Sequence, residues 1–280
     1  MHSLKRSLKA FWQLLRLEHG LMYGLGVVIG IILGNGASPD LFILGFLTAL
    51  FFQASAFAMN DYLDYEVDVV NKRYDRPLVR GDISRRMALI LSILFFPLGC
   101  LTSFLISVQA LIFAATLSAL GHLYNYKLKE FGFIGNVYIA FTMSAPFIFG
   151  GIISKMTYEV LILSLIAFLC GVGREVMKGI EDVEGDKIRN VRSVARIYGI
   201  ESAVKISSAL FLASIFLSFL PPLLIPEYFD IKYLFPVLLT DLILFRVVLA
   251  LRKSREISRF RKETLIAMLL GLIGFLAGAF

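Results

Sequence analysis

The sequence lacks several features on which soluble and secreted proteins depend. Cysteine occurs only twice in 280 residues, as Cys100 and Cys170, and each lies inside an apolar run. Such a pair gives neither a disulfide framework nor the spacing of a metal site, so it leaves the redox compartment open. Charged residues make up only 18% of the chain, and no linker or low-complexity tract divides it. We therefore expect a single domain over residues 1–280.

Apolar residues are what the chain has in excess. They make up 58% of it, with a mean hydropathy of +0.78, and long uncharged runs recur. A transmembrane helix needs about 20 apolar residues, and such runs are too long for barrel strands. The basic start leads directly into the first run, without the pattern of a cleavable signal peptide. We predict an all-α membrane protein, a bundle of about nine transmembrane helices with a central cavity that opens to the cytoplasmic side. The expected spans are residues 14–33, 41–61, 86–107, 109–126, 134–154, 160–177, 202–220, 233–251 and 264–280.

The basic residues are distributed unevenly around these spans. Twenty-six lysines and arginines lie at one set of helix ends, whereas the opposite loops hold only Lys155 and Lys232. The positive-inside rule makes the rich side cytoplasmic, in a multi-pass protein of the cell membrane. An odd number of spans then leaves the C-terminus outside. Because this distribution accounts for the net charge of +7, we expect no nucleic-acid partner. No obligate protein partner is indicated either.

One stretch places several carboxylates directly after an apolar run. The uncharged residues 41–59 are followed by Asn60-Asp61-Tyr62-Leu63-Asp64-Tyr65-Glu66-Val67-Asp68. On a helix, Asp64 and Asp68 lie one turn apart, and Asp61 lies in the same narrow stripe. Three carboxylates on one face repel each other unless a cation lies among them. The stretch is therefore either a solvated helix end or a divalent cation site. Mg²⁺ is favoured, because it binds a few carboxylates together with substrate phosphates.

A second acidic stretch repeats this spacing. Residues 174–187 follow another apolar run, and within them Asp182 and Asp186 are again one turn apart. An offset of 118 positions relates Asp64 to Asp182, Asp68 to Asp186 and Gly81 to Gly199. This offset indicates an internal repeat, which is parallel because an even number of spans separates the copies. Two such helix ends would clamp Mg²⁺ ions on one diphosphate. The alternative is a coincidence between two acidic loops.

Basic residues beside the two motifs suit the binding of a polyanion. Arginine offers bidentate contacts to phosphate oxygens, and lysine offers a point charge. Each of these residues also has a simpler explanation, which is contact with lipid headgroups at the cytoplasmic face. The candidates are Arg73, Arg76, Arg174, Lys178, Lys127 and Lys129.

Further polar residues lie inside the expected spans. Gln53, Asn60 and Asp64 share one helix face, which in lipid must point to the bundle interior. Gln53 and His122 have an equally good explanation as partners in hydrogen bonds between helices. Asp241, in the middle of a span, is either paired structurally or lines the cavity, and the sequence leaves both open.

A diphosphate site at the membrane surface, beside an apolar interior, indicates a prenyl diphosphate. Metal neutralises the departing diphosphate, and aromatic faces stabilise the allylic cation that remains. An acceptor then attacks its C1 carbon, and Asp61 or Asp68 could take the proton late. A transporter for a cation or an anionic solute is the competing class of protein. Transporter sites lie near the membrane midplane, however, whereas these carboxylates lie at one mouth.

The two motifs resemble those of a known family. Asn60-Asp61-x-x-Asp64-x-x-x-Asp68 and Asp182-x-x-x-Asp186, each at the cytoplasmic end of a helix, look like those of the UbiA-type intramembrane prenyltransferases. The resemblance covers essentially the whole chain. Through Asn71-Lys72…Arg76-Pro77-Leu78 and Arg174-Glu175…Lys178, it is strongest to the members that make archaeal ether lipids.

The resemblance implies both a reaction and a set of site residues. The metal and catalytic residues would be Asp61, Asp64, Asp68, Asp182 and Asp186 with Mg²⁺, and the substrate-binding residues would include Asn60 and Arg16. The family's Tyr-x-x-x-Lys motif is not cleanly present, since Tyr124, Tyr126, Lys127 and Lys129 have its chemistry at a shifted spacing. The implied reaction transfers a geranylgeranyl group from its diphosphate to the hydroxyl of geranylgeranylglyceryl phosphate. The alternative is an aromatic acceptor, as in quinone biosynthesis.

Overall fold

The computed structural model describes residues 2–126, 131–188, 191–253 and 256–280. Every regular element in these ranges is helical, as the long apolar runs require, because a helix satisfies its own backbone hydrogen bonds in lipid. The elements are α1 (His2–Leu15), α2 (Leu17–Leu33), α3 (Pro39–Val70), α4 (Arg85–Ile106), α5 (Val108–Tyr126), α6 (Phe133–Ile153), α7 (Tyr158–Glu181), α8 (Val183–Ile188), α9 (Val194–Tyr198), α10 (Ile200–Leu217), α11 (Leu220–Leu224), the 3₁₀ turn η2 (Pro226–Tyr228), α12 (Ile231–Leu251) and α13 (Ile257–Gly278).

Each expected span falls on one of the long helices α2 to α7, α10, α12 and α13. By length and composition, six helices in the described residues are suited to cross a membrane, or seven if the bent pair α1 and α2 counts as one. The number of nine spans is therefore not confirmed. Neither α5 nor α13 is among those that qualify. The first turns of α13 carry charged residues, and the last turns of α5 are polar.

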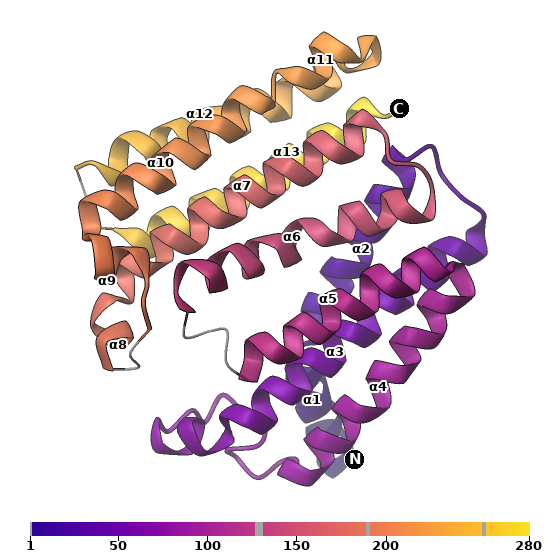
Figure 1. The fold of residues 1–280 in the computed structure, drawn as a ribbon, viewed down its shortest axis with the longest axis vertical. Helices are drawn as coiled ribbons and strands as arrows, with labels where there is room; N and C mark the ends of the chain where they lie inside the picture. Colours follow the sequence, from indigo (N-terminus) through magenta and orange to yellow (C-terminus); the bar gives the residue numbers. More distant parts are fainter. Residues whose placement is uncertain (1, 127–130, 189–190, 254–255) are drawn as a thin grey trace.

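The helices form two groups that follow the internal repeat (Figure 1). In the first half, α3 is followed by a charged loop and α4; in the second, α7 is followed by α8, α9 and α10. The equivalent glycines, Gly81 and Gly199, both have positive φ, at 74° and 85°, and each precedes the next long helix. Only glycine adopts this backbone conformation without strain. The two halves thus both place a glycine of positive φ shortly before the next long helix.

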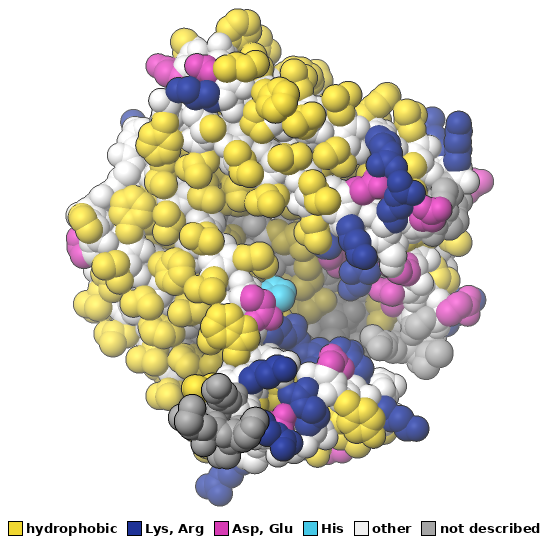
Figure 2. Space-filling model, turned by 180° about the vertical axis from the view of Figure 1, so that it is seen from behind, with side chains coloured by type: hydrophobic (Ala, Val, Ile, Leu, Met, Phe, Trp, Pro, Cys, Tyr) yellow, Lys and Arg dark blue, Asp and Glu magenta, His cyan; other side chains and the backbone are white. Residues whose placement is uncertain are grey.

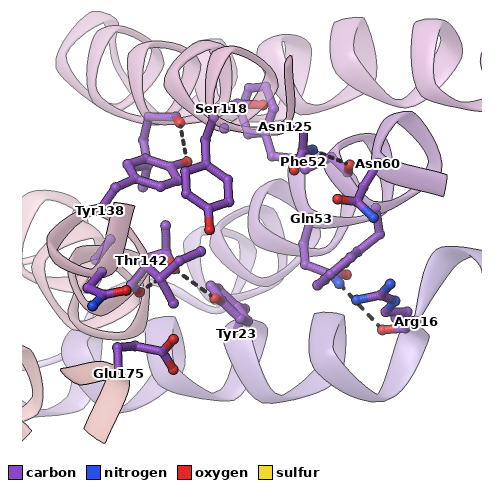
Figure 3. A pocket seen from close by; sticks show the side chains of 18 of the residues that line it. Arg16, Tyr23, Phe52, Gln53, Asn60, Ser118, Asn125, Tyr138, Thr142 and Glu175 are labelled. Atoms are coloured by element: carbon purple, nitrogen blue, oxygen red, sulfur yellow. Dashed lines mark hydrogen bonds between the residues drawn. The ribbon is translucent and has the colours of Figure 1, made fainter. Parts of the chain in front are cut away.

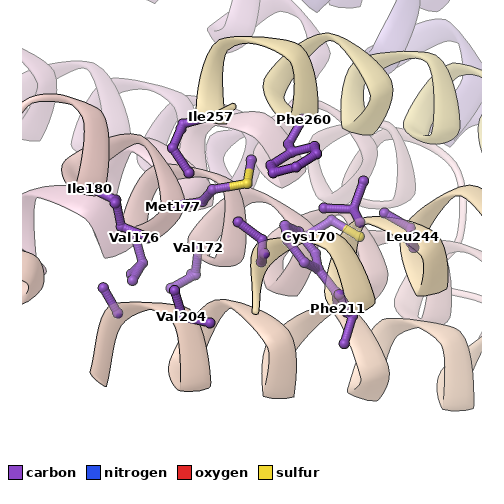
Figure 4. Close-up of a cluster of buried hydrophobic side chains, with 14 of the residues drawn as sticks. Cys170, Val172, Val176, Met177, Ile180, Val204, Phe211, Leu244, Ile257 and Phe260 are labelled. Atoms are coloured by element: carbon purple, nitrogen blue, oxygen red, sulfur yellow. The ribbon is translucent and has the colours of Figure 1, made fainter. Parts of the chain in front are cut away.

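Close packing and polar contacts hold the helices together. Gly30 on α2 and Gly150 on α6 meet backbone to backbone, and a Cβ atom on either would overlap a carbonyl oxygen of the other helix. Such small residues let membrane helices approach closely. Between α3 and α4, Thr48 Oγ1 donates to Thr102 Oγ1 at 2.9 Å. Figure 4 shows the largest apolar cluster, in which α7, α10, α12 and α13 pack around side chains such as Met177 and Phe211.

The charged segments gather at one end of the bundle. The α3–α4 loop and the short helices α8 and α9 lie at the left and lower left of Figure 1, while the C-terminus lies at the opposite end. Figure 2 shows that charged side chains surround a hollow at this end, whereas most of the remaining visible face is hydrophobic. Helix α1 packs Ala10 and Leu14 against Leu78 and Ile83 of the α3–α4 loop. Arg6 of α1 also pairs with Asp82, with 2.7 Å between nitrogen and oxygen.

Candidate functional site

A cavity of about 840 Å³ opens between the two halves. This volume lies within the range of ligand pockets, about 300–1,000 Å³. Charged residues of both acidic motifs line one part of it, and Val27, Phe52, Phe113 and Phe149 line another. The cavity therefore combines a polar mouth with an apolar interior, as predicted.

Some residues of the first motif line the cavity, and one is buried away from it. Asn60, Asp64 and Asp68 line the cavity, and α3 continues as one helix to Val70, well past the expected end of the span at residue 61. Asp61 is not among the lining residues, and only 2% of its surface is exposed.

Asp61 forms ion pairs with two arginines. Its Oδ1 accepts hydrogen bonds from Nη1 of Arg76 at 2.6 Å and from Nη2 of Arg16 at 3.3 Å. Both arginines line the cavity. The prediction that Asp61 is a metal ligand therefore finds no support in this arrangement, because its carboxylate holds guanidinium groups instead of facing the cavity.

Arg16 lies at the break between α1 and α2. Its φ of 44° is left-handed, and the two helices are bent by 50° relative to each other. The Arg16 guanidinium lies 4.1 Å from the centre of the Phe57 ring, a cation–π contact. Its carbonyl oxygen accepts a hydrogen bond from Nε2 of Gln53 at 3.5 Å (Figure 3). These contacts from α3 hold both the backbone and the side chain of Arg16 at the cavity mouth.

The second motif also reaches the cavity. Lys178 and Asp182 line it from α7, and Asp186 lines it from α8. Asp182 is the C-cap residue of α7, and its carbonyl accepts from the backbone N–H of Asp186 at 2.8 Å, which preserves the one-turn spacing across the break. Glu175 lines the cavity one turn before Lys178 (Figure 3). Glu175 was not among the candidate residues predicted from the sequence, although its helical spacing to Lys178 and Asp182 places all three on one face.

Arg174, which the sequence predicts to bind substrate, is not among the residues that line the cavity. Its Nη1 nitrogen nevertheless lies 3.8 Å from Oε1 of Glu175, which does line the cavity. Arg174 also lies near Arg261 of α13, which interacts with it electrostatically. Arg261 in turn pairs with Glu181 at 3.1 Å. Arg174 and Glu181 thus share the face of α7 that is turned to α13.

The α3–α4 loop supplies the other cations. Arg73 and Arg76 both line the cavity. Arg73 donates two hydrogen bonds to Asp75, at 2.9 and 2.8 Å, which lower the pKa of Asp75 to about 2. Arg76 Nε also lies 3.8 Å from Asp68 Oδ2, so that it bridges two acidic residues of the first motif. Lys127 and Lys129 lie outside the described residues.

Hydroxyl and aromatic side chains, which sequence analysis missed, line the inner part of the cavity. Tyr23 donates a hydrogen bond to Thr142 at 3.2 Å, and Tyr138 donates to the carbonyl of Leu117 at 3.2 Å (Figure 3). Tyr124, which the family's Tyr-x-x-x-Lys motif had already drawn attention to, stacks on Tyr138 with 5.1 Å between ring centres. No charge pattern marks these positions in the sequence. Only the helix-by-helix arrangement brings α2, α5 and α6 together around them.

The remaining intramembrane polar residues have separate roles. His122 bonds to Ser55 of α3 at 3.3 Å, which is the interhelical hydrogen bond given as one alternative, while Gln53 both bonds and lines the cavity. Asp241 accepts from Ser218 at 2.8 Å. It also lines a second cavity, of about 180 Å³, that is separate from the lining of the first. Asp241 is thus paired structurally, and it does not line the cavity that carries the acidic motifs.

In the part of the chain that the structure describes, no three His, Cys, Asp or Glu side chains form a group that could hold a metal ion by themselves. The predicted stripe of three carboxylates is broken because Asp61 turns to the arginines. The remaining carboxylates come as pairs, Asp64 with Asp68 and Asp182 with Asp186, on the two sides of one cavity.

Residues 24–278 match the UbiA prenyltransferase family. The chain belongs to that family. Among its UbiA relatives, the digeranylgeranylglyceryl phosphate synthase of Archaeoglobus fulgidus is 58% identical, over 100% of this chain and 98% of its own. The synthase of the same name from Pyrococcus furiosus is 32% identical over 97% of both chains. The family predicted from the two motifs is thereby confirmed.

Solved structures of the UbiA family have the same fold. A structure of digeranylgeranylglyceryl phosphate synthase in membranes matches with a TM-score of 0.85 at 31% identity, over 98% of both chains. A UbiA homologue from Archaeoglobus fulgidus, bound to GPP and Mg²⁺, matches with a TM-score of 0.72 at 21% identity, over 97% of this chain and 100% of its own. The second likeness concerns the fold alone.

Proposed function

We propose that this protein transfers a geranylgeranyl group from geranylgeranyl diphosphate to the hydroxyl of geranylgeranylglyceryl phosphate, a step in the synthesis of archaeal ether lipids. One observation carries the proposal: in a chain 58% identical to a digeranylgeranylglyceryl phosphate synthase, both acidic motifs and four cations meet at the mouth of one cavity with an apolar interior. The mouth suits a diphosphate, and the interior suits its prenyl chain.

The metal is Mg²⁺, which Asp64 and Asp68 from one half and Asp182 and Asp186 from the other would hold. The donor set fits this ion, because Mg²⁺ is usually bound by one or two carboxylates, waters and substrate phosphates instead of a closed protein cage. Paired carboxylates on two sides of a cavity match this mode of Mg²⁺ binding. When bound, Mg²⁺ neutralises charge on the diphosphate and makes it a better leaving group.

The cations bind the diphosphate oxygens. Arg16, Arg73, Arg76 and Lys178 line the mouth, with Asn60 as a neutral donor beside them. Arg16 and Arg76 are held in place by Asp61, so their orientation is set before substrate arrives. Such preorganised charge acts without reorganisation as charge develops on the leaving group.

The chain's own residues then shelter the reaction. The bond between C1 and the diphosphate oxygen breaks, and the faces of aromatic side chains such as Tyr124 and Tyr138 stabilise the allylic cation. The acceptor hydroxyl attacks C1 and forms the ether bond. Its proton leaves late, to a carboxylate that lines the cavity, Asp68 or Glu175. Diphosphate is released at the mouth.

We place this mouth at the cytoplasmic face of the cell membrane. Support comes from the concentration of lysine and arginine on the segments around it, since cytoplasmic loops carry an excess of these residues. In Figure 2, lysine and arginine side chains gather around the hollow at this end. Geranylgeranylglyceryl phosphate, with its headgroup at the same surface, would then meet the donor from the lipid side.

The test is a direct assay of purified protein with labelled geranylgeranyl diphosphate, Mg²⁺ and one acceptor at a time. We expect product with geranylgeranylglyceryl phosphate and none with 4-hydroxybenzoate or a naphthoate. Chelation of the metal should abolish turnover. Asp64→Asn and Asp182→Asn should each lower kcat/KM by at least about 100-fold, since even outer-shell partners of metal ligands cost 10–100-fold. Asp40→Asn, the same change at the far end of α3, is the matched control and should behave as wild type.

Product with aromatic acids alone would overturn the acceptor while leaving prenyl transfer intact. Uptake of a solute without release of diphosphate would instead favour the transporter class.

A further inference from the structure

Helix α1 has a face that remains largely exposed in the described residues. The inner face of α1 buries Ala10, Leu14 and Leu15 against α3 and the α3–α4 loop. On the outside, Leu8 and Trp12 lie one turn apart and remain 61% and 46% exposed. Trp12 is the only tryptophan in the chain. We define Leu8, Trp12 and the neighbouring Lys9 as the outer face of α1.

The charge of α1 has one sign. The helix contains no Asp or Glu, and Lys9 and Arg6 are exposed beside the apolar pair. Arg6 keeps 74% of its side chain exposed even while it pairs with Asp82. A helix with a basic polar side, and with tryptophan and leucine next to it, has the composition of helices that lie in the interface of a membrane. Tryptophan is also enriched at that depth, because its ring is apolar and its N–H is polar.

The position of α1 in the fold agrees with its composition. It joins α2 through the 50° bend at Arg16, so it does not continue the line of that membrane helix. Fourteen residues are also too few to cross the hydrocarbon core, which requires about 20. The helix is moreover held against the charged α3–α4 loop, at the end of the bundle where headgroups would lie.

We propose that the outer face of α1 is a docking surface for the anionic lipid surface of the bilayer. Leu8 and Trp12 enter the boundary between headgroups and acyl chains, and Lys9 and Arg6 contact the anionic headgroups. Since Trp12 and Arg16 are one turn apart in sequence, this contact sets the depth of the cavity mouth in the membrane. The proposal does not depend on which acceptor the enzyme uses.

The single tryptophan makes the first test direct. The full chain is reconstituted into vesicles whose phosphatidylcholine carries bromine either near the headgroup or deep in the acyl chain, and tryptophan emission is recorded. We expect Trp12 to lose more emission with the shallow bromines than with the deep ones, and to be protected from aqueous iodide. A Trp12→Phe, Leu242→Trp double variant is the control for depth. Leu242 is 65% exposed in the middle of α12 and should show the opposite preference.

Charge is tested by replacing the brominated phosphatidylcholine with brominated phosphatidylglycerol at the same mole fraction. We expect the anionic lipid to quench Trp12 more strongly, and Lys9→Glu to remove the difference without affecting quenching by the zwitterionic lipid. Efficient quenching by iodide together with none by either bromolipid would overturn the docking surface. Equal quenching by both headgroups in the unmodified chain would overturn its preference for anionic lipid.

Discussion

Asp61 and Asp64 lie less than one helical turn apart on α3, yet their surroundings differ. Asp64 lines the cavity, whereas Asp61 is buried against Arg16 and Arg76. The three side chains of this cluster are at most 22% exposed, so solvent screens their interaction poorly. At the scale of single residues, the first motif therefore combines two roles: Asp64 faces the ligand site, and Asp61 holds two arginines in position.

Asp61→Asn should separate these tasks. The change leaves two partly buried guanidinium groups without their shared counterion, and breaking a buried ion pair in this way costs about 3 kcal/mol. We expect a lower unfolding midpoint in detergent and a higher KM for the prenyl diphosphate. Asp64→Asn should show the reverse, with a near-normal midpoint and a collapsed kcat. Equal midpoints for the two variants would show that Asp61 is not an anchor.

At the scale of elements, the crossing of α2 and α6 depends on two glycines that meet backbone to backbone. Gly30→Ala places a methyl group against the carbonyl of Phe147 and should destabilise the protein by about 1–3 kcal/mol, the usual cost of overpacking. Gly271→Ala on α13 is the matched control, because its Cβ would lie 3.5 Å from Thr240, an ordinary contact. Thermal unfolding in detergent measures both variants. A Gly30→Ala midpoint equal to that of Gly271→Ala would contradict the close approach.

The contact between α1 and the α3–α4 loop should depend on pH. Hydrogen bonds from Arg80 and Arg6 lower the pKa of Asp82 below its ordinary value of 3.8. A carboxyl whose pKa is lower in the folded state stabilises that state above the ordinary value, and this contribution is lost as pH falls through the lowered pKa. The unfolding midpoint of wild type should therefore exceed that of Asp82→Asn near neutral pH. The difference should close in acid, and a constant difference would rule out Asp82 as its source.

The elements were largely predictable from sequence, and the site only in part. Uncharged runs located the long helices because the apolar length of a span is a strong constraint. The apolar span was set to end at residue 61, since hydropathy falls where the acidic motif begins, but the motif itself was expected to be helical, and α3 continues to Val70. Arg174 was expected to bind substrate from its nearness in sequence to Lys178, and it is not among the residues that line the cavity, while Tyr23 and Tyr138 were missed altogether. These differences have one cause: the face that a helix turns to its neighbours is set by packing, which sequence spacing alone does not determine.

At the scale of the whole molecule, the two halves present their acidic motifs at one end, while the C-terminus lies at the other (Figure 1). In a chain with Cys100 and Cys170 replaced by alanine, a cysteine at Asp75 should react with a membrane-impermeant maleimide only from the cytoplasmic side. A cysteine at Asp40, at the other end of α3, should react only from outside. Both positions are exposed in the structure, so burial would not limit either reaction. The opposite labelling pattern would reverse the orientation.

The parallel repeat affects the orientation in which the diphosphate substrate binds. A diphosphate has two ends, only one of which carries the prenyl chain, and a mouth made of two identical halves would accept both orientations with equal energy. The halves are not identical where they meet the ligand. By the offset of 118 positions, the equivalent of Asn60 is Lys178, and the equivalent of Asp61, which holds two arginines, is Gly179. This broken symmetry gives the two orientations different energies. A duplicated site thereby acquires a direction, with one position for the phosphate that is joined to the prenyl chain and the other for the terminal phosphate, and both leave together as diphosphate.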